Sequence, residues 1–325
     1  MDLFGNTYES TLNDYFNYWR KRGYPNYQKE SYSPKKELSN LISFNEFTII
    51  KKDVIKQTMH SLGFLWCYFP HWIDVEYGNQ RTIRELWDDD DKLKELIKKT
   101  YDYELKHGGG TITTNRLRQN SKVYLSKQSV SNFRPTAAKY IYNKYANNGV
   151  VWDMSSGWGG RLFGFLASNA KKYIGTEPAK ETFKGLLEIR KDFNTKDVEL
   201  FNCGSEDYRP IENSLDLCFT SPPYFDTEKY SKDDTQSYLK FNTKDLWLEG
   251  FYKKTIENCH HGLKTGGAMV INIANTPKHK WLEDETINIT KSIGFKLQET
   301  LRLELSSISG KGAKYEPIFI FKKLD

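Results

Sequence analysis

The sequence predicts an α/β fold, with a mainly parallel sheet that carries an antiparallel C-terminal hairpin, preceded by a mainly helical N-terminal region. Strand-like and helix-like segments alternate from residue 131 to residue 325, which is typical of a mainly parallel sheet. Two strand-like segments adjoin at the end without a helix between them, which favours an antiparallel pair at the edge of that sheet. Residues 1–130 instead show helical apolar spacing. We therefore expect two regions, 1–130 and 131–325.

The clearest helical period in the N-terminal region lies in residues 82–105, "TIRELWDDDDKLKELIKKTYDYEL". Its apolar side chains recur at helical spacing, at Leu86, Leu93, Leu96 and Ile97. The acidic run Asp88–Asp91 fits a solvated helix start better than a metal site, because acidic residues favour the first helical turn.

A basic, hydroxyl-rich connector follows the helix-breaking glycines 108–110. It offers candidates for phosphate contacts, namely Arg116, Arg118, Lys122 and Lys127. An ordinary exposed linker explains the same residues equally well.

The elements expected after residue 131 follow in chain order. Pro135 suits the first turn of a helix over 135–146. Further helices are expected over 161–170, 180–193, 246–263 and 281–295. Strands are expected over 149–155, 171–178, 198–203, 214–224, 266–275, 296–305 and 315–323.

Composition narrows the class of protein. The chain has 325 residues, 28% of them charged, a mean hydropathy of −0.71, and no apolar run of the roughly 18 residues that a membrane helix needs. We expect a cytoplasmic protein without a membrane segment, because no secretory signal is visible at its start. The four cysteines lack CxxC spacing and the six histidines lack helical pairing, so we expect reduced thiols and no metal. The net charge of +6 mildly favours a polyanionic partner.

A glycine cluster follows the first strand of the second region. "VVWDMSSGWGGRLFGFL" places Asp153 at the strand end and Gly157, Gly159 and Gly160 in the turn before a helix. Such glycines allow a tight turn and close approach to a ligand, and the helix N-terminus adds N–H donors. Glu177 ends the next strand, where an acidic side chain accepts hydrogen bonds from ribose hydroxyls in nucleotide sites.

A second motif follows the apolar strand "LDLCFT". The chain passes directly into Ser221-Pro222-Pro223-Tyr224. The two prolines hold φ near about −65° and donate no backbone hydrogen bond. The backbone between a small hydroxyl and an aromatic ring is therefore stiff.

Together these motifs resemble the S-adenosylmethionine-dependent DNA amino-methyltransferases, which alkylate the exocyclic nitrogen of cytosine or adenine. The resemblance covers roughly residues 130–325: an acid-x-x-x-Gly-x-Gly loop, a ribose-binding acid, a [S/D/N]-P-P-[Y/F] tetrapeptide, and an upstream cofactor motif in "NFRPTAAKYI". It implies a Rossmann-like class I methyltransferase fold. It assigns S-adenosylmethionine binding to Phe133, Pro135, Asp153, Ser155, Gly157, Gly159, Glu177, Pro178, Ser205, Glu206 and Thr220, and catalysis to Ser221, Pro222, Pro223 and Tyr224.

The chain departs from the family at two places. Met154 and Ser155 stand where the family usually has Pro-Phe, and Trp158 is bulky inside the turn. Where an aspartate commonly reaches the adenine, this chain has "NCGSEDY", so Ser205 or Glu206 is expected to replace it.

The tetrapeptide has the chemistry of an amine clamp. An exocyclic amine is a poor nucleophile, because its lone pair is delocalised into the ring. The Ser221 hydroxyl and the Pro222 carbonyl can each accept one of its N–H bonds, which frees the lone pair, and the prolines keep that carbonyl aimed. Tyr224 offers a face on which a flipped-out base stacks. Methylation of a ring carbon would need a Pro-Cys pair, and no cysteine of this chain follows a proline.

We therefore expect a cytosine-N4 DNA methyltransferase that binds double-stranded DNA and flips its target base, as in restriction-modification. Three alternatives remain: adenine N6 as target, an RNA or protein-amide methyltransferase, and a catalytically silent nucleic-acid-binding module. A homodimer or a companion restriction endonuclease is compatible with the sequence, which carries no signal for either.

Two segments are candidates for DNA contacts. Residues 1–130 are expected to pack beside the cleft and supply much of the DNA contact, with a purely structural cap as the alternative. The loop after the tetrapeptide could also face nucleic acid, through Lys229, Tyr230, Lys232 and Gln236.

Overall fold

The computed structural model of the protein describes residues 7–125, 130–305 and 313–324. The chain divides into two compact units. Unit 1 contains Met1–Tyr27, Pro70–Ser131 and Glu228–Tyr230, and unit 2 contains Gln28–Phe69, Asn132–Thr227 and Ser231–Asp325. The passage between units at residue 131 adjoins the boundary expected from sequence, whereas residues 28–69 group with unit 2 and residues 228–230 with unit 1.

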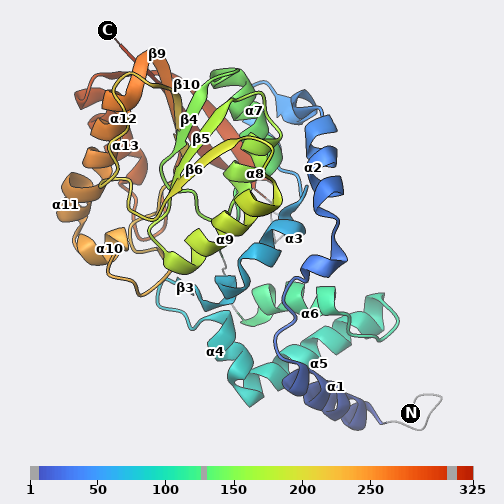
Figure 1. The fold of residues 1–325 in the computed structure, drawn as a ribbon. Coiled ribbons are helices and arrows are strands. Elements are labelled where there is room, and N and C mark those ends of the chain that lie inside the picture. The colour runs from blue at the N-terminus through green and yellow to red at the C-terminus, as the bar shows by residue number, and fades with distance from the viewer. Residues whose placement is uncertain (1–6, 126–129, 306–312, 325) are drawn as a thin grey trace. The chain divides into compact units, whose positions relative to one another are not determined.

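Unit 2 is built around one sheet (Figure 1). Its described strands lie in the order β1-β2-β10-β11-β9-β7-β4-β5-β6. Their bounds are β1 Ile50–Lys51, β2 Val54–Ile55, β4 Val150–Asp153, β5 Lys172–Thr176, β6 Asp197–Phe201, β7 Leu215–Thr220, β9 Leu263–Asn272, β10 Phe295–Leu305 and β11 Lys314–Lys323.

The strand directions confirm the predicted fold. Strands β6, β5, β4, β7 and β9 are parallel, and β11 lies antiparallel between β9 and β10. This is the strand arrangement of the Rossmann-like class I methyltransferase fold. The expected C-terminal hairpin is present, but it does not form the edge of the sheet, because β2 pairs in parallel with β10.

The centre of the sheet is apolar on both faces. Trp152 of β4 and Leu217, Cys218 and Phe219 of β7 are fully buried. A strand covered on both faces reads as a continuous apolar run rather than an alternating one. This is why "LDLCF" has no polar side chain in its second half.

Helices cover both faces of this sheet (Figure 1). On one face lie α7 (Pro135–Tyr145), α8 (Gly160–Leu166) and α9 (Lys180–Asp192), and on the other α12 (Lys254–Gly262) and α13 (Leu282–Ser292). The helix expected over 246–263 consists of α11 (Lys244–Trp247), the π-helical segment η6 (Leu248–Lys253) and α12, preceded by the short α10 (Ser237–Lys240).

Helix α8 ends at Leu166, four residues before the expected end. The Ser168 hydroxyl donates to the Phe165 carbonyl over 2.8 Å, and the Lys196 ammonium donates to the carbonyls of Phe165, Ser168 and Ala170. A cation from outside the helix thus binds one carbonyl of its last turn and two carbonyls of the segment that follows.

A buried lysine is one of the contacts that join residues 28–69 to the rest of unit 2. The Lys139 ammonium of α7 donates to the carbonyls of Leu41, Ile42 and Phe44 over 3.2, 2.9 and 2.7 Å. It also lies 3.1 Å from the Glu46 carboxylate. The segment contains α2 (Pro34–Ser43), α3 (Leu62–Leu65), the 3₁₀ turns η1 (Lys29–Ser31), η2 (Glu46–Ile49) and η3 (Trp66–Tyr68), and the strands β1 and β2.

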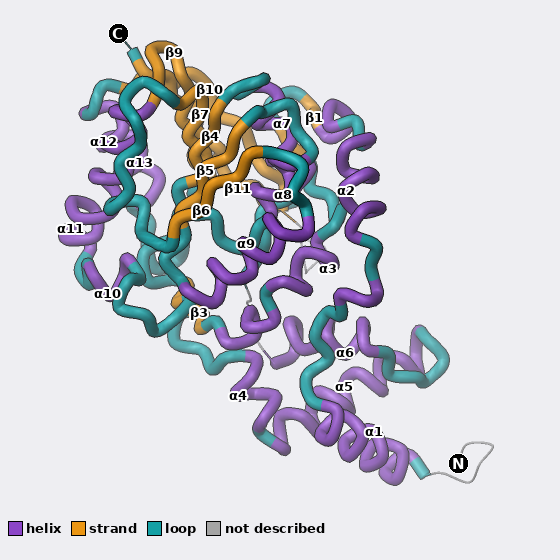
Figure 2. Tube along the Cα trace, in the orientation of Figure 1, coloured by secondary structure: helices purple, strands orange, loops and turns teal. Residues whose placement is uncertain are grey.

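Unit 1 is almost entirely helical, as Figure 2 shows. It contains α1 (Tyr8–Arg22), α4 (Ile83–Asp88), α5 (Asp90–His107) and α6 (Thr114–Asn120), with the shorter η4 (Pro70–Asp74) and η5 (Ser121–Leu125). The helical run expected over 82–105 is two helices, because Asp89 caps the second: its Oδ1 accepts from the N–H groups of Asp91 and Lys92 over 3.1 and 3.2 Å. The acidic run is therefore a helix start, as predicted.

Unit 1 also contains a two-stranded sheet that the sequence did not predict. Strand β3 (Glu76–Tyr77) pairs antiparallel with β8 (Glu228–Lys229), and the Lys229 ammonium lies 2.6 Å from the Glu76 carboxylate. The residues just after the tetrapeptide loop are thereby tied to unit 1. Among the described helices of the whole chain, none is long and apolar enough to cross a membrane.

Candidate active site

The two sequence motifs leave the sheet side by side. Trp152 of β4 pairs with Cys218 of β7 in parallel register, so the loops that follow these strands emerge at the same edge. Strand order reverses here, since β5 and β6 lie on one side of β4 and β7 and β9 on the other. In open α/β sheets, ligands bind at this switch point, outside the carboxyl ends of the strands.

The glycine loop between β4 and α8 requires its glycines. Gly157 and Gly159 have φ values of +54° and +74°, which lie in a backbone region that residues other than glycine rarely adopt. A Cβ atom on Gly159 would also lie 2.6 Å from the Ile189 Cδ1 atom of α9. The predicted tight turn is present, with Gly159 as the residue preceding α8.

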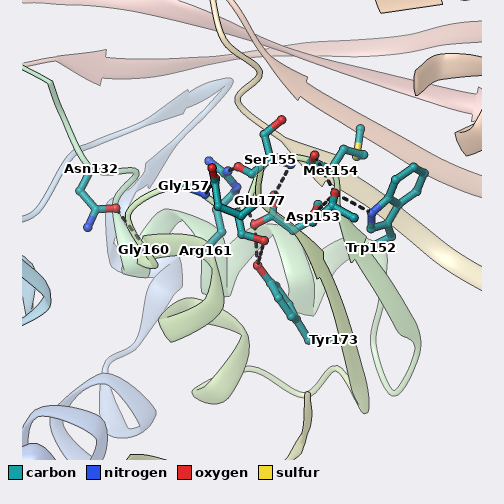
Figure 3. A network of polar contacts seen from close by, with 12 residues as sticks. Asn132, Trp152, Asp153, Met154, Ser155, Gly157, Gly160, Arg161, Tyr173 and Glu177 are labelled. Atoms are coloured by element: carbon teal, nitrogen blue, oxygen red, sulfur yellow. Dashed lines mark hydrogen bonds and ion pairs between the residues drawn. The ribbon is translucent and has the colours of Figure 1, made fainter. Parts of the chain in front are cut away.

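Asp153 anchors this loop from inside (Figure 3). Its carboxylate has no exposed surface. Oδ2 accepts from the Arg161 Nε and the Tyr173 hydroxyl over 2.9 and 2.8 Å, and Oδ1 accepts from the Ser155 N–H over 3.3 Å. Arg161 also donates to the Ser155 carbonyl. Asp153 and Ser155 thus form one internal network around the turn.

Two residues of this network were missed from the sequence. The Asn132 amide accepts from the Gly160 N–H over 3.0 Å and donates to the Trp158 carbonyl over 2.7 Å, which holds the loop from the other side. Arg161 is buried within a helix that is otherwise apolar. In the sequence, a single charged residue inside the apolar segment "RLFGFL" could have drawn attention to Arg161. No sequence pattern pointed to Asn132.

Glu177 closes the loop from the end of β5. Its Oε2 accepts from the Gly157 N–H and its Oε1 from the Ala179 N–H, both over 2.9 Å. Burial raises the pKa of this carboxyl to about 7, although the two N–H groups oppose the shift. The predicted ribose-binding acid therefore meets the predicted glycine turn, and its protonation changes near neutral pH.

The residues expected around the cofactor on the α7 side form an apolar wall. The Phe133 ring meets Phe219 edge-on at 5.3 Å between centroids, and the Arg161 guanidinium lies 5.7 Å from the Phe133 centroid. Pro135 is buried at the first position of α7, as expected. The Pro178 carbonyl instead accepts from the side chains of Asn202 and Thr235, both over 3.2 Å.

The structure distinguishes between Ser205 and Glu206, the two candidates for the adenine contact. The Ser205 hydroxyl is buried and bonds to the Thr255 hydroxyl over 2.8 Å. The Glu206 Oε1 accepts from the Lys240 ammonium over 2.6 Å, but its Oε2 is buried and has no hydrogen-bond partner among the described residues. The Thr220 hydroxyl, at the end of β7, is likewise buried and has no described partner. Glu206 and Thr220 retain free hydrogen-bonding capacity that Ser205 has used.

The tetrapeptide is held at its downstream end. Ser221 and Tyr224 are half-buried, and Pro222 is buried. Phe225 follows in the left-handed region, with φ +55°, and its ring packs against the Trp247 ring at 5.7 Å between centroids. The Asp226 carboxylate then accepts from His279 Nε2 over 2.6 Å and lies 2.5 Å from the Lys278 ammonium.

The basic connector does not present the expected set of free cations. Arg118 is buried, donates to the Pro25 carbonyl over 2.8 Å and stacks on Tyr27 at 3.8 Å, so its assignment as a phosphate contact is wrong. Arg116 lies 2.5 Å from the Glu104 carboxylate, and the Lys122 ammonium lies over the Trp72 ring at 4.3 Å. Lys127 lies outside the described residues.

The loop after the tetrapeptide is also more engaged than expected. Lys229 pairs with Glu76, the Tyr230 hydroxyl donates to Glu228, and Gln236 is buried. Of the four residues suggested for nucleic-acid contact, Lys232 is exposed, and it stays a candidate.

Comparison with known proteins gives structural similarity alone. No family model and no curated protein matches the chain. Similar solved structures include M. jannaschii TYW2 in complex with AdoMet, at 14% identity over 62% of this chain and 81% of that chain, with a TM-score of 0.41. A SAM-dependent O-methyltransferase from Thermotoga maritima is 12% identical over 63% of this chain and 71% of that chain, with a TM-score of 0.40. A SAM-dependent methyltransferase from Methanosarcina mazei is 14% identical over 57% of this chain and 97% of that chain, with a TM-score of 0.40. The fold assignment rests on the strand order and register of the sheet.

Proposed function

We propose that the protein is a cytoplasmic S-adenosylmethionine-dependent methyltransferase that modifies the exocyclic amine of a flipped DNA base, with cytosine N4 as the target. One observation carries the proposal. A glycine turn closed by a buried carboxylate and a Ser-Pro-Pro-Tyr segment leave adjacent parallel strands at the switch point of the sheet.

The residues of the glycine loop fit a cofactor with a ribose and an adenine. Each Glu177 oxygen accepts one backbone N–H, which leaves lone pairs for ribose hydroxyls. Buried polar atoms without a partner are rare in proteins, and Glu206 Oε2 and the Thr220 hydroxyl are two of them in this region. We assign Glu206 Oε2 to the amino group of the adenine. The bound cofactor would supply a methyl group on a sulfonium.

The tetrapeptide would prepare the nitrogen that receives this methyl group. The Ser221 hydroxyl and the Pro222 carbonyl each accept one N–H of the amine, so that its lone pair leaves conjugation with the ring. Tyr224 stacks on the base. Because the two prolines limit backbone motion, these acceptors need little reorganisation during the reaction.

The cofactor assignment is tested by calorimetric titration with S-adenosylmethionine. Glu177→Ala removes charge-assisted hydrogen bonds worth roughly 1.5–3 kcal/mol each, so its affinity should fall by at least about tenfold. Glu206→Ala should also weaken binding, whereas Ser205→Ala should not. Glu181→Ala, on the exposed first turn of α9, is the matched control. Wild-type affinity in Glu177→Ala would reject the assignment.

The reaction is tested by nucleoside mass spectrometry of DNA from cells that express the protein. N4-methylcytosine would support the proposal, and N6-methyladenine would support the alternative target, since the clamp chemistry is the same. Ser221→Ala should abolish most of the product without changing cofactor affinity. Product in RNA or in a protein amide, with none in DNA, would replace the proposed substrate. Cofactor binding without any product would favour the silent binding module.

Unit 1 is the proposed DNA-contacting part of the protein. Its helices carry no residue of the glycine loop or the tetrapeptide. Strand β8, which follows the tetrapeptide in sequence, pairs with β3 of unit 1. The exposed Lys232, which belongs to unit 2 and follows β8, is a separate candidate for a DNA contact. Neutralising it should weaken DNA binding and reduce the slope of log affinity against log salt by about 0.9 if it contacts one phosphate. An unchanged slope would remove this residue from the interface.

A further inference from the structure

The segment after β9 leaves the sheet beside the tetrapeptide. Thr220 of β7 pairs with Ile271 of β9 in parallel register, so the segments that follow these two strands emerge at the same edge. The segment after β9 contains His279, which is buried. The backbone of this histidine is fixed, because its N–H donates to the Thr276 hydroxyl over 3.0 Å and its carbonyl accepts from the Thr276 N–H over 3.1 Å.

The tetrapeptide ends in a turn that its own residues do not favour. The Thr227 N–H donates to the Tyr224 carbonyl over 3.2 Å, which closes a β-turn over residues 224–227. Phe225, the second residue of this turn, has a φ of +55°. Glycine and asparagine usually occupy such a position, and a bulky residue rarely adopts this conformation. The turn therefore depends on support from the residues around it.

His279 supplies this support through two contacts. Its ring meets the Phe225 ring at 5.3 Å between centroids, and its Nε2 donates to Asp226 Oδ1 over 2.6 Å. Burial acts to raise the pKa of Asp226, but Lys278 and His279 outweigh it and lower the pKa, so this carboxylate is ionised at neutral pH. His279 thus contacts both central residues of the turn, one through packing and the other through a charge-assisted hydrogen bond.

The turn determines where the Tyr224 ring lies. On the other side of Tyr224 stand two prolines, which hold φ near about −65°. The turn binds the Tyr224 carbonyl, so the backbone of this residue is fixed from both directions. A fixed backbone sets the direction of the Cα–Cβ bond and therefore the region that the ring can occupy. If Phe225 returned to a negative φ, the turn would open and the ring would be displaced.

We propose that His279 is a positioning residue for methyl transfer, which holds the turn after the tetrapeptide and thereby the place at which the Tyr224 ring meets the substrate base. This inference rests on the proposed function, because that function gives Tyr224 a base on which to stack. His279 acts through Phe225 and Asp226. Strand β7 lies between β9 and β4, so the glycine loop after β4 should keep its affinity for the cofactor when His279 is changed.

The test measures methyl transfer from labelled S-adenosylmethionine to saturating, unmethylated plasmid DNA. His279→Ala removes both contacts with the turn and should lower kcat by about tenfold or more, the effect of losing one hydrogen bond to a charged group. His279→Gln should recover part of this turnover, because its amide N–H can still reach Asp226. Lys278→Ala removes the exposed partner of the same carboxylate and should lower kcat by about threefold or less.

Two further measurements separate positioning from a general structural role. The affinity for S-adenosylmethionine, measured by calorimetry, should be unchanged in both His279 variants. His261→Ala is the matched control, because this histidine lies in the last turn of α12, just before β9 begins, and it should behave as wild type.

Each failure has its own outcome. Full turnover in His279→Ala would overturn the positioning role, and so would a parallel loss of turnover and cofactor affinity. An equal loss of turnover in Lys278→Ala would also overturn it, because the charge on Asp226 would then matter and not the contact with the turn. If His279→Ala does not fold, Asp226→Asn weakens the same hydrogen bond, and full turnover in that variant overturns the proposal. A wild-type protein that transfers no methyl group to DNA would instead overturn the proposed function.

Discussion

Glu177 should make the stability of the ligand-free protein depend on pH, and Glu177→Gln should remove that dependence. Burial raises the pKa of Glu177 from 4.5 to about 7 in the folded protein. The folded state then holds a proton that the unfolded chain has already lost. The stabilisation is fully present below pH 4.5 and is lost as the pH rises through 7.

The magnitude follows from the two pKa values. The difference is 7 − 4.5, or 2.5 units, and each unit corresponds to about 1.36 kcal/mol, which gives roughly 3 kcal/mol. Glutamine keeps the shape of the side chain but stays neutral. The free energy of unfolding of the variant, minus that of the wild type, should therefore rise by about 3 kcal/mol between pH 4.5 and pH 7.5.

The assay is urea unfolding at several pH values across this range, without S-adenosylmethionine. The pKa of Glu316 is also raised, but Glu316 is present in both proteins and cancels in the difference. Glu181→Gln is the control, because Glu181 lies on the surface and pairs with Lys184. If the Glu177→Gln and wild-type curves run parallel, Glu177 is ionised in the folded state across the whole range, and the reasoning from burial is refuted.

Three further changes test how the structure is held. Gly159→Ala should cost roughly 2 kcal/mol of unfolding free energy, because its φ is +74° and the new Cβ would crowd Ile189; an unchanged urea midpoint would contradict this. Arg161→Ala leaves the Asp153 carboxylate buried and unpaired, so calorimetry should show a loss of about 3–5 kcal/mol, and a loss under 1 kcal/mol would argue against this ion pair. Arg118→Ala should lower the thermal midpoint while the salt dependence of DNA binding stays the same; a flatter salt slope at full stability would restore Arg118 as a phosphate contact.

The sequence by itself determined the features that depend on neighbouring residues. The alternation of apolar strands and amphipathic helices after residue 131 defined the mainly parallel sheet, because side-chain periodicity is a local property. The glycine turn and the stiff tetrapeptide were also predictable from the sequence, because φ above zero favours glycine and two prolines stiffen any backbone. The acidic run Asp88–Asp91 as a helix start and Pro135 at the first position of α7 belong to the same group.

Tertiary structure alone decided what each charged side chain does. Arg118 looked like a phosphate contact in a basic connector, but folding places it on Tyr27 and the Pro25 carbonyl, 91 and 93 positions away. Lys139 lies in a helix that the sequence predicted, and folding places its ammonium on the last carbonyls of α2. No local pattern distinguishes a solvated cation from a buried one, because the partners come from distant segments.

The pairing of distant strands was equally beyond the sequence. Strands β3 and β8 have two residues each, too few for a period, and their paired residues lie 153 and 151 positions apart. The motif residues were therefore predictable from their own chemistry. The residues that hold them became visible only in the fold, because a hydrogen bond depends on distance in space and not on distance along the chain.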